Sequence, residues 1–83
     1  MEALFNMQEK IRSIVAKTFN LESDKILNDT GPENVQKWDS FGQMTLVLAI
    51  EAEFNIVLDY EEIFRINSTG TLIELVEEKL NDI

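Results

Sequence analysis

The sequence contains neither cysteine nor histidine. Without cysteine the chain cannot form disulfides, which is typical of a protein in a reducing compartment, and we expect the cytoplasm. The most common general base and the thiol nucleophile of enzymes are also missing. A serine nucleophile would need a base such as a buried lysine, and the lysines look like solvated surface residues. We therefore expect a protein without catalytic activity of its own.

Glycine and basic residues are scarce as well, with three glycines and seven Lys plus Arg. There is no glycine-rich phosphate loop, and neither Asp24 nor Asp29 starts the alternating oxygen ligands and glycine of a calcium loop. So few bases argue against a nucleic-acid partner. No apolar run is long enough to span a bilayer, and the first residues lack the pattern of a secretory signal. We expect no metal, nucleic-acid or membrane partner.

Acidic residues are abundant and unevenly placed. The 16 Asp plus Glu give a net charge of −9. Residues 1–38 carry −1 of it and residues 39–83 carry −8. Such a surface attracts basic partners. Acidity can also simply keep a small protein soluble, so charge alone decides nothing.

The apolar residues, with 45% hydrophobic content, suffice for one small core in a single domain over residues 1–83. Their three- and four-residue spacing predicts helices over 2–18 and 40–54. A short helix is expected over 59–64, capped by Asp59, and a last one over 71–81, with a capping box of Thr71 and Glu74. The predicted fold is all-α: a small four-helix bundle with a short third helix.

Residues 20–39 form a long connection between the first two helices. They have no sustained period, and Gly31-Pro32 indicates a turn. A structureless loop of this length is uncommon in a compact domain. Four apolar residues recur along it and are expected to anchor it to the core: Ile26, Leu27, Val35 and Trp38. We predict an ordered loop, with a short helical turn in it.

Ser40 lies in the stretch WDSFGQM, residues 38–44. Serine is a preferred N-cap, and Gln43 three residues later would complete a capping box. Alternatively, the Ser40 hydroxyl carries a phosphodiester-linked group, because a helix N-terminus stabilises phosphate and exposes the hydroxyl. The two roles are compatible, since a cap serine is well presented for attachment.

The helix predicted over 40–54 is apolar over most of its circumference. Such a helix is either deeply buried or keeps a face for a partner or ligand. Deep burial on all sides is hard to achieve in so small a domain. The pattern favours a binding face.

Residues 38–64, WDSFGQMTLVLAIEAEFNIVLDYEEIF, resemble the acyl carrier protein family. In that family an Asp-Ser pair and a large apolar residue open the second helix, and the serine receives 4′-phosphopantetheine from coenzyme A. The matching residues here are Asp39, Ser40 and Phe41. The resemblance implies a carrier of acyl groups whose thiol comes from the prosthetic arm on Ser40, which would explain why the chain has no cysteine.

The resemblance also implies partner and cargo sites. Asp39 would help to position the metal and substrate of the phosphopantetheinyl transferase. The expected partner face, for that enzyme and for acyl ligases, synthases or transferases with basic or apolar docking patches, consists of Asp39, Phe41, Met44, Leu46 and Glu51. The acyl group would lie between the second and third helices, in a cavity lined by Met44, Val47, Leu48, Ile63 and Phe64. We expect a monomer.

Trp38, Gly42 and Gln43 depart from the common family pattern, and Glu51 and Glu53 are the only acids within residues 40–54. These departures favour a discrete carrier of a specialised pathway over general fatty-acid synthesis, with more apolar recognition. Two alternatives remain open. One is a carrier of aminoacyl or peptidyl groups, and the other is an unmodified acidic helical interaction module in which Ser40 only caps.

Overall fold

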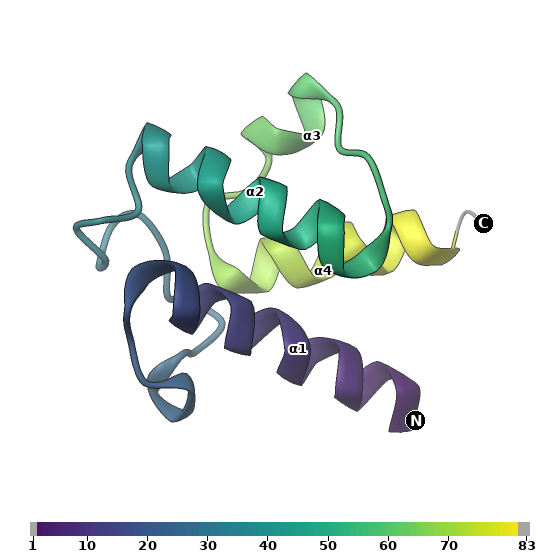
Figure 1. Ribbon diagram of the computed structural model, residues 1–83, viewed down its shortest axis with the longest axis horizontal. Coiled ribbons are helices and arrows are strands. Elements are labelled where there is room, and N and C mark those ends of the chain that lie inside the picture. The colour runs from purple at the N-terminus through teal and green to yellow at the C-terminus, as the bar shows by residue number, and fades with distance from the viewer. Residues whose placement is uncertain (1, 82–83) are drawn as a thin grey trace.

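The computed structural model describes the backbone of residues 2–81 and the side chains of residues 6–81. Its elements are four α-helices and one short 3₁₀ helix: α1 (Glu2–Phe19), η1 (Ser23–Lys25), α2 (Ser40–Phe54), α3 (Tyr60–Phe64) and α4 (Thr69–Asn81). The described part of the chain has no strand. The predicted all-α fold, with a long first connection and a short third helix, is confirmed (Figure 1).

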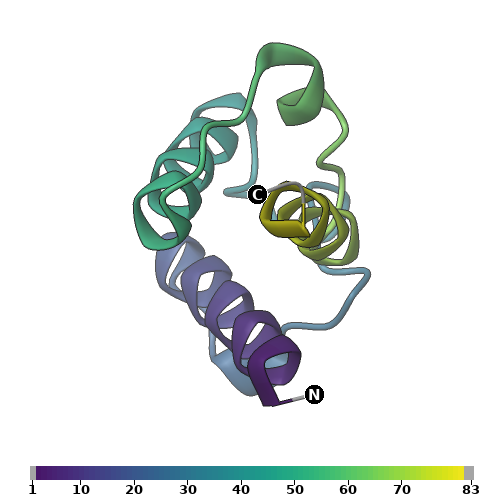
Figure 2. The ribbon, with the colours of Figure 1, turned by 90° about the vertical axis from the view of Figure 1, so that its right-hand side faces the viewer.

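The three long helices surround a common core. α1 runs in one direction, and α2 and α4 return in the other (Figure 1). Figure 2 looks along the bundle and shows α3 on the side of α2 and α4 that faces away from α1. The largest fully buried hydrophobic side chains come from all three long helices and from the loop before α2: Ile11, Val15, Trp38, Leu46, Val47, Ile50, Leu72, Leu75 and Val76.

The long loop between α1 and α2 is tied to the start of α4. The carbonyl oxygen of Thr30 accepts from the backbone N–H of Thr69 at 2.7 Å and from its hydroxyl at 2.9 Å. The N–H of Gly70 donates to the carbonyl of Asn28 at 2.9 Å. These bonds join residues far apart in sequence, so the predicted ordered loop is confirmed.

The anchors of this loop are only partly those expected. Ile26 and Trp38 are buried and Val35 is half-buried, as predicted. Leu27 is 62% exposed, so its prediction as an anchor was wrong. The backbone N–H of Leu27 donates to the hydroxyl of Thr30 at 2.9 Å, in a turn that leaves the leucine side chain in solvent.

The N-terminus of α4 differs from the prediction. The helix starts at Thr69, and the predicted capping box of Thr71 and Glu74 was wrong. The hydroxyl of Ser68 accepts from the N–H of Thr71 at 3.1 Å, and the hydroxyl of Thr71 accepts from the N–H of Ser68 at 3.0 Å. Ser68 is therefore the cap, because its reciprocal bonds with Thr71 satisfy the first turn.

α3 is capped as predicted and is held to α4 by two ion pairs. Asp59 and Glu62 form a reciprocal capping box. The Glu62 carboxylate also binds the Lys79 ammonium at 3.0 and 3.1 Å. Just after α3, Arg65 pairs with Glu78 at 2.8 Å. Both bases of the acidic half of the chain thus connect the α3 region to α4.

The hydrogen bond and the charge of Glu78 raise the pKa of Arg65 above its usual range. A raised folded-state pKa gives stability that is present below the unfolded pKa and lost only as the pH rises through the folded one. Arg65 therefore keeps its charge throughout the neutral range.

Candidate functional site

The first turn of α2 is capped by Asp39. Its backbone is extended, and its carboxylate accepts from the N–H of Gly42 at 2.9 Å. Ser40 is the first helical residue, so its prediction as the cap was wrong. Asp39, one residue earlier, supplies the side-chain oxygen that accepts a hydrogen bond from the first turn. The Ser40 side chain is exposed and takes no part in the cap.

Gly42 is buried where the preceding loop crosses the first turn of α2. A Cβ at this position would overlap the carbonyl oxygen of Lys37 and lie 2.8 Å from a ring carbon of Phe19. Real Cβ atoms do not approach other atoms so closely. Glycine is therefore required for the loop backbone to pack against the helix just beside Ser40.

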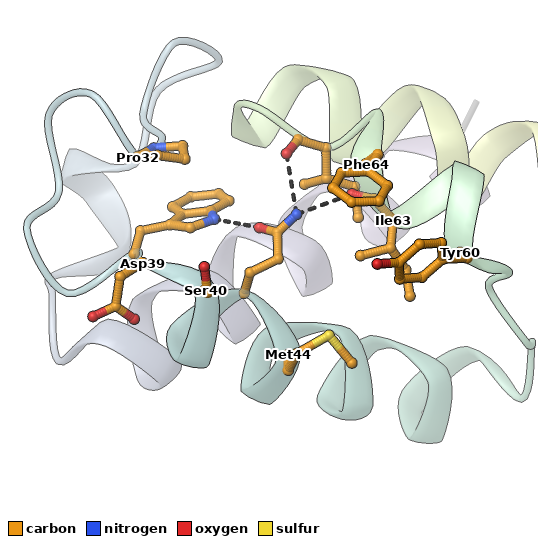
Figure 3. Close-up of a pocket in the computed structure, with 10 residues that line it drawn as sticks. Pro32, Asp39, Ser40, Met44, Tyr60, Ile63 and Phe64 are labelled. Carbon is orange, nitrogen blue, oxygen red and sulfur yellow. Dashed lines mark hydrogen bonds between the residues drawn. The ribbon is translucent and has the colours of Figure 1, made fainter.

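Gln43 does not complete a capping box with Ser40 but joins three segments. Its Oε1 accepts from Trp38 Nε1 at 2.6 Å, and its Nε2 donates to the carbonyls of Ile63 and Ile66 at 3.0 and 3.1 Å (dashed in Figure 3). We call this set of three bonds the Gln43 bridge. It connects the loop before α2, α2 itself and the end of α3.

Trp38 holds the loop side of the Gln43 bridge in place. Only 2% of the residue is exposed, and its ring stacks on Phe19 with centroids 5.0 Å apart. A buried indole N–H without a partner costs about 1–3 kcal/mol. The bond to Gln43 removes that cost, and every buried side-chain N or O atom of the described residues has a partner.

A groove lies next to Ser40, between α2 and α3. It has a volume of about 560 Å³. Ser40 points into it from the first turn of α2, with Met44 on the α2 side and Tyr60 and Phe64 on the α3 side (Figure 3). Ten residues line the groove: Pro32, Trp38, Asp39, Ser40, Gln43, Met44, Tyr60, Ile63, Phe64 and Ile66.

The groove includes three of the five residues predicted to line an acyl cavity, namely Met44, Ile63 and Phe64. Val47 and Leu48 do not line it. Val47 is 2% exposed and packs in the core, whereas Leu48 is 63% exposed and lies outside the groove. When a helix is apolar on several sides, the sequence does not show which of its apolar residues share one face. For this reason the sequence did not separate Val47 and Leu48 from the residues that line the groove.

Only some of the residues predicted for the partner face are exposed. Asp39, Phe41 and Met44 are exposed, with Phe41 at 82%. Leu46 is fully buried, so its prediction as an exposed partner residue was wrong; it lies two residues beyond Met44 and therefore faces the opposite side of α2. The Glu51 carboxylate accepts from the backbone N–H of Leu58 at 2.8 Å and braces the connection to α3.

Large apolar side chains are exposed along α2, the α2–α3 connection and α3. Tyr60 and Phe64 pack edge to face with ring centroids 4.8 Å apart, yet both are more than 70% exposed. Phe64, which was predicted to line an acyl cavity, lies at the open side of the groove. The exposed apolar set is Phe41, Met44, Leu48, Val57, Tyr60 and Phe64. We call it the apolar face.

Comparison with known proteins gives the family. The chain is 31% identical over 74 residues to an acyl carrier protein of Buchnera aphidicola subsp. Schizaphis graminum, covering 89% of this chain and 94% of the relative. The chain belongs to the acyl carrier protein family. An acyl carrier protein of Cyanidium caldarium is also 31% identical over 74 residues, covering 89% of this chain and 86% of that relative. One from Petrotoga mobilis is 29% identical over 73 residues, covering 88% and 86%.

A solved structure supports the same fold. The solution structure of a holo acyl carrier protein from Geobacter metallireducens superposes with a TM-score of 0.80 at 24% identity, covering 92% of this chain and 87% of that one. No family model matches the chain. Within residues 2–81, none of the helices has the length and apolar character to cross a membrane. Among the side chains of residues 6–81, no cluster of potential metal ligands occurs.

Five groove residues were missing from the predicted carrier site: Pro32, Trp38, Gln43, Tyr60 and Ile66. Gln43 was predicted only as a capping residue and as a departure from the family pattern. A signal for its actual role was present, because Gln43 is the only amide residue in a largely apolar helix and follows the only tryptophan by five residues. Its backbone partners lie 20 and 23 residues away, beyond the reach of local spacing.

Proposed function

We propose that this member of the acyl carrier protein family carries 4′-phosphopantetheine, derived from coenzyme A, on Ser40. The observation that supports this best is the separation of two tasks at the start of α2. Asp39 caps the helix, and Ser40 follows it with an exposed hydroxyl at the edge of the groove. The cargo would be acyl intermediates of fatty-acid, polyketide or related biosynthesis.

The residues around Ser40 fit such a group. Beyond the capping carboxylate of Asp39, the first turn of α2 contains no acidic residue to repel a phosphodiester, and a helix N-terminus favours a negative charge. The groove beside Ser40 offers hydrogen-bonding side chains near the serine and apolar side chains farther along α2 and α3. That order suits an arm that is charged at its attachment point and carries an acyl group at its far end.

When bound, the prosthetic group supplies the thiol that the sequence lacks, and acyl groups attach to it as thioesters. The remaining tasks belong to the chain. Ser40 would present its hydroxyl oxygen to the pantetheine-side phosphorus of coenzyme A. As the new O–P bond forms, the pyrophosphate linkage breaks, adenosine 3′,5′-bisphosphate leaves, and the serine proton passes to a base of the transferase. Asp39 keeps the first turn formed and offers its exposed carboxylate to the metal of the transferase. The chain itself catalyses no step.

The partner enzymes would dock on the apolar face. Phe41 and Met44 lie within one turn of Ser40 and are exposed. The acidic half of the chain would bring basic enzyme surfaces near, and apolar contacts beside Ser40 would then hold them. Partners of this carrier would include a phosphopantetheinyl transferase and the ligases, synthases or transferases that load and use the acyl group.

Intact mass after modification tests the proposal. The protein is incubated with coenzyme A, magnesium and a broad-specificity phosphopantetheinyl transferase. We expect a gain of one phosphopantetheinyl unit, no gain for Ser40→Ala, and a full gain for Ser23→Ala, a matched control at another exposed serine. A wild-type chain that stays unmodified would contradict the proposal and favour an unmodified interaction module. A gain that survives Ser40→Ala would exclude Ser40 as the site.

A further inference from the structure

The groove next to Ser40 reaches the core at Trp38 and Ile66, which are 2% and 4% exposed, but it does not extend to the buried side of α2. Its lining includes none of Leu46, Val47 and Ile50, which are at most 2% exposed. The Gln43 bridge spans the space between the start of α2 and the end of α3. A chain passing from Ser40 between these helices toward the core would meet the Gln43 amide and its three bonds.

The helices on the two sides of the groove are also held in place. α3 is joined to α4 by the Glu62–Lys79 pair, and the residue after α3 by the Arg65–Glu78 pair. Moving α3 away from α2 would break both bonds of the Gln43 side-chain nitrogen. Displacing the amide itself would leave the buried N–H of Trp38 without an acceptor. Opening a deeper cavity would therefore require several polar interactions to be lost together.

We propose that Gln43 is a specificity-determining residue, which keeps the acyl group in the open groove and out of the core. This inference rests on the proposed function of Ser40. A cargo in the groove contacts Met44, Tyr60 and Phe64 but remains open to water, so a longer alkyl chain gains little further burial. The carrier is then suited to short or polar acyl groups.

The rate at which hydroxylamine cleaves the thioester measures how well the acyl group is sheltered. The full-length holo protein is loaded with acetyl, octanoyl or dodecanoyl groups. We expect the same cleavage rate for the three forms of the wild type. In Gln43→Leu, which has an apolar side chain of similar size, we expect dodecanoyl to be cleaved roughly tenfold more slowly than acetyl, because each buried methylene favours the sheltered state. Gln36→Leu, the same change at an exposed loop position, should behave as the wild type does.

A measurement on the wild type alone covers the case in which Gln43→Leu does not fold. Methyl NMR of the dodecanoyl form should show shifts at Met44 and Ile63 and none at Leu46, Val47 or Ile50. Shifts at these core methyls, or wild-type cleavage that slows with chain length, would overturn the inference while the carrier function stands. Failure to gain the arm on Ser40 would overturn the proposed function, and this inference with it, before any acyl group is loaded.

Discussion

The indole nitrogen of Trp38 lies 2.6 Å from the side-chain oxygen of Gln43, and both residues line the groove beside Ser40. The other end of the same amide donates to two backbone carbonyls. Gln43 is thus used as a donor and an acceptor at once. Neither a carboxylate, which only accepts, nor an aliphatic side chain can reproduce both kinds of bond.

Gln43→Glu should therefore destabilise the protein at neutral pH. A carboxylate would keep the bond from Trp38 but face the carbonyls of Ile63 and Ile66 without a proton to donate. The fold disfavours its charged form, so the pKa of the new carboxyl should be raised above its unfolded value of about 4.3. The loss of folding stability is therefore fully present when the pH is above the pKa of this carboxyl in the folded state. It disappears as the pH falls below the pKa of the same carboxyl in the unfolded state.

Urea unfolding of Gln43→Glu and wild type between acidic and neutral pH measures this difference. Taking the difference removes the titration of the native carboxylates that both proteins share. Gln36→Glu, at an exposed loop position, is the matched control and should show no such pH dependence. Equal stability of wild type and Gln43→Glu at neutral pH would mean that the bridge contributes little.

Gly42→Ala should destabilise the protein although it lies in a helix. Helix propensity alone predicts a gain of up to about 1 kcal/mol from this change. The new methyl group would instead press on the Lys37 carbonyl and the Phe19 ring, and such overpacking typically costs about 1–3 kcal/mol. Thermal unfolding decides between the two signs. A higher melting temperature for Gly42→Ala would show that the loop can move away from α2 at little cost.

Two variants of Asp39 should separate its role in helix capping from its proposed role in the modification of Ser40. Asp39→Ala removes the cap and should lower the free energy of unfolding by about 1 kcal/mol, whereas Asp39→Asn keeps a capping oxygen and should leave stability nearly unchanged. Both variants lose the carboxylate proposed to assist the transferase. We expect slower phosphopantetheinyl transfer for both, measured by intact mass over time. Transfer to Asp39→Asn at the wild-type rate would restrict Asp39 to its capping role.

The ion pair between α3 and α4 should matter more than a solvent-exposed pair. The side chains of Lys79 and Glu62 are 27% and 19% exposed, against 61% and 41% for Lys10 and Glu53. Lys79→Met keeps the apolar stem but leaves a half-buried carboxylate without its partner, and we expect a loss of about 1–2 kcal/mol. Lys10→Met should change stability by less than about 0.5 kcal/mol. Denaturant unfolding measures the loss of stability in each variant. Equal losses for Lys79→Met and Lys10→Met would contradict this ranking.

The sequence predicted the helices better than their ends. The range 40–54 is confirmed residue for residue, because its apolar periodicity stops where Asn55 adopts a left-handed backbone. The N-caps of α2 and α4 were placed one to three residues late. Asp39 and Ser40 are both good caps, as are Ser68 and Thr71, and local preference does not choose between such neighbours.

The exposed position of Ser40 at the start of α2 was predictable from the sequence, and the surroundings of Ser40 were less so. Leu46 and Met44 are both apolar, and only the packing of α2 against the bundle decides that the first is buried and the second exposed. The placement of Gln43 depends on the end of α3, a contact between residues distant in sequence. Such contacts follow from the assembled fold and leave no local periodic trace.

The groups that form the Gln43 bridge are an amide, an indole and two peptide carbonyls, and none of them gains or loses a proton within the pH range of living cells. A histidine in place of the amide would make this junction sensitive to small changes in acidity. With glutamine, the three bonds that join the loop, α2 and the end of α3 do not depend on the proton concentration. The junction beside Ser40 would therefore keep the same bonds in an acidified cell as in a neutral one.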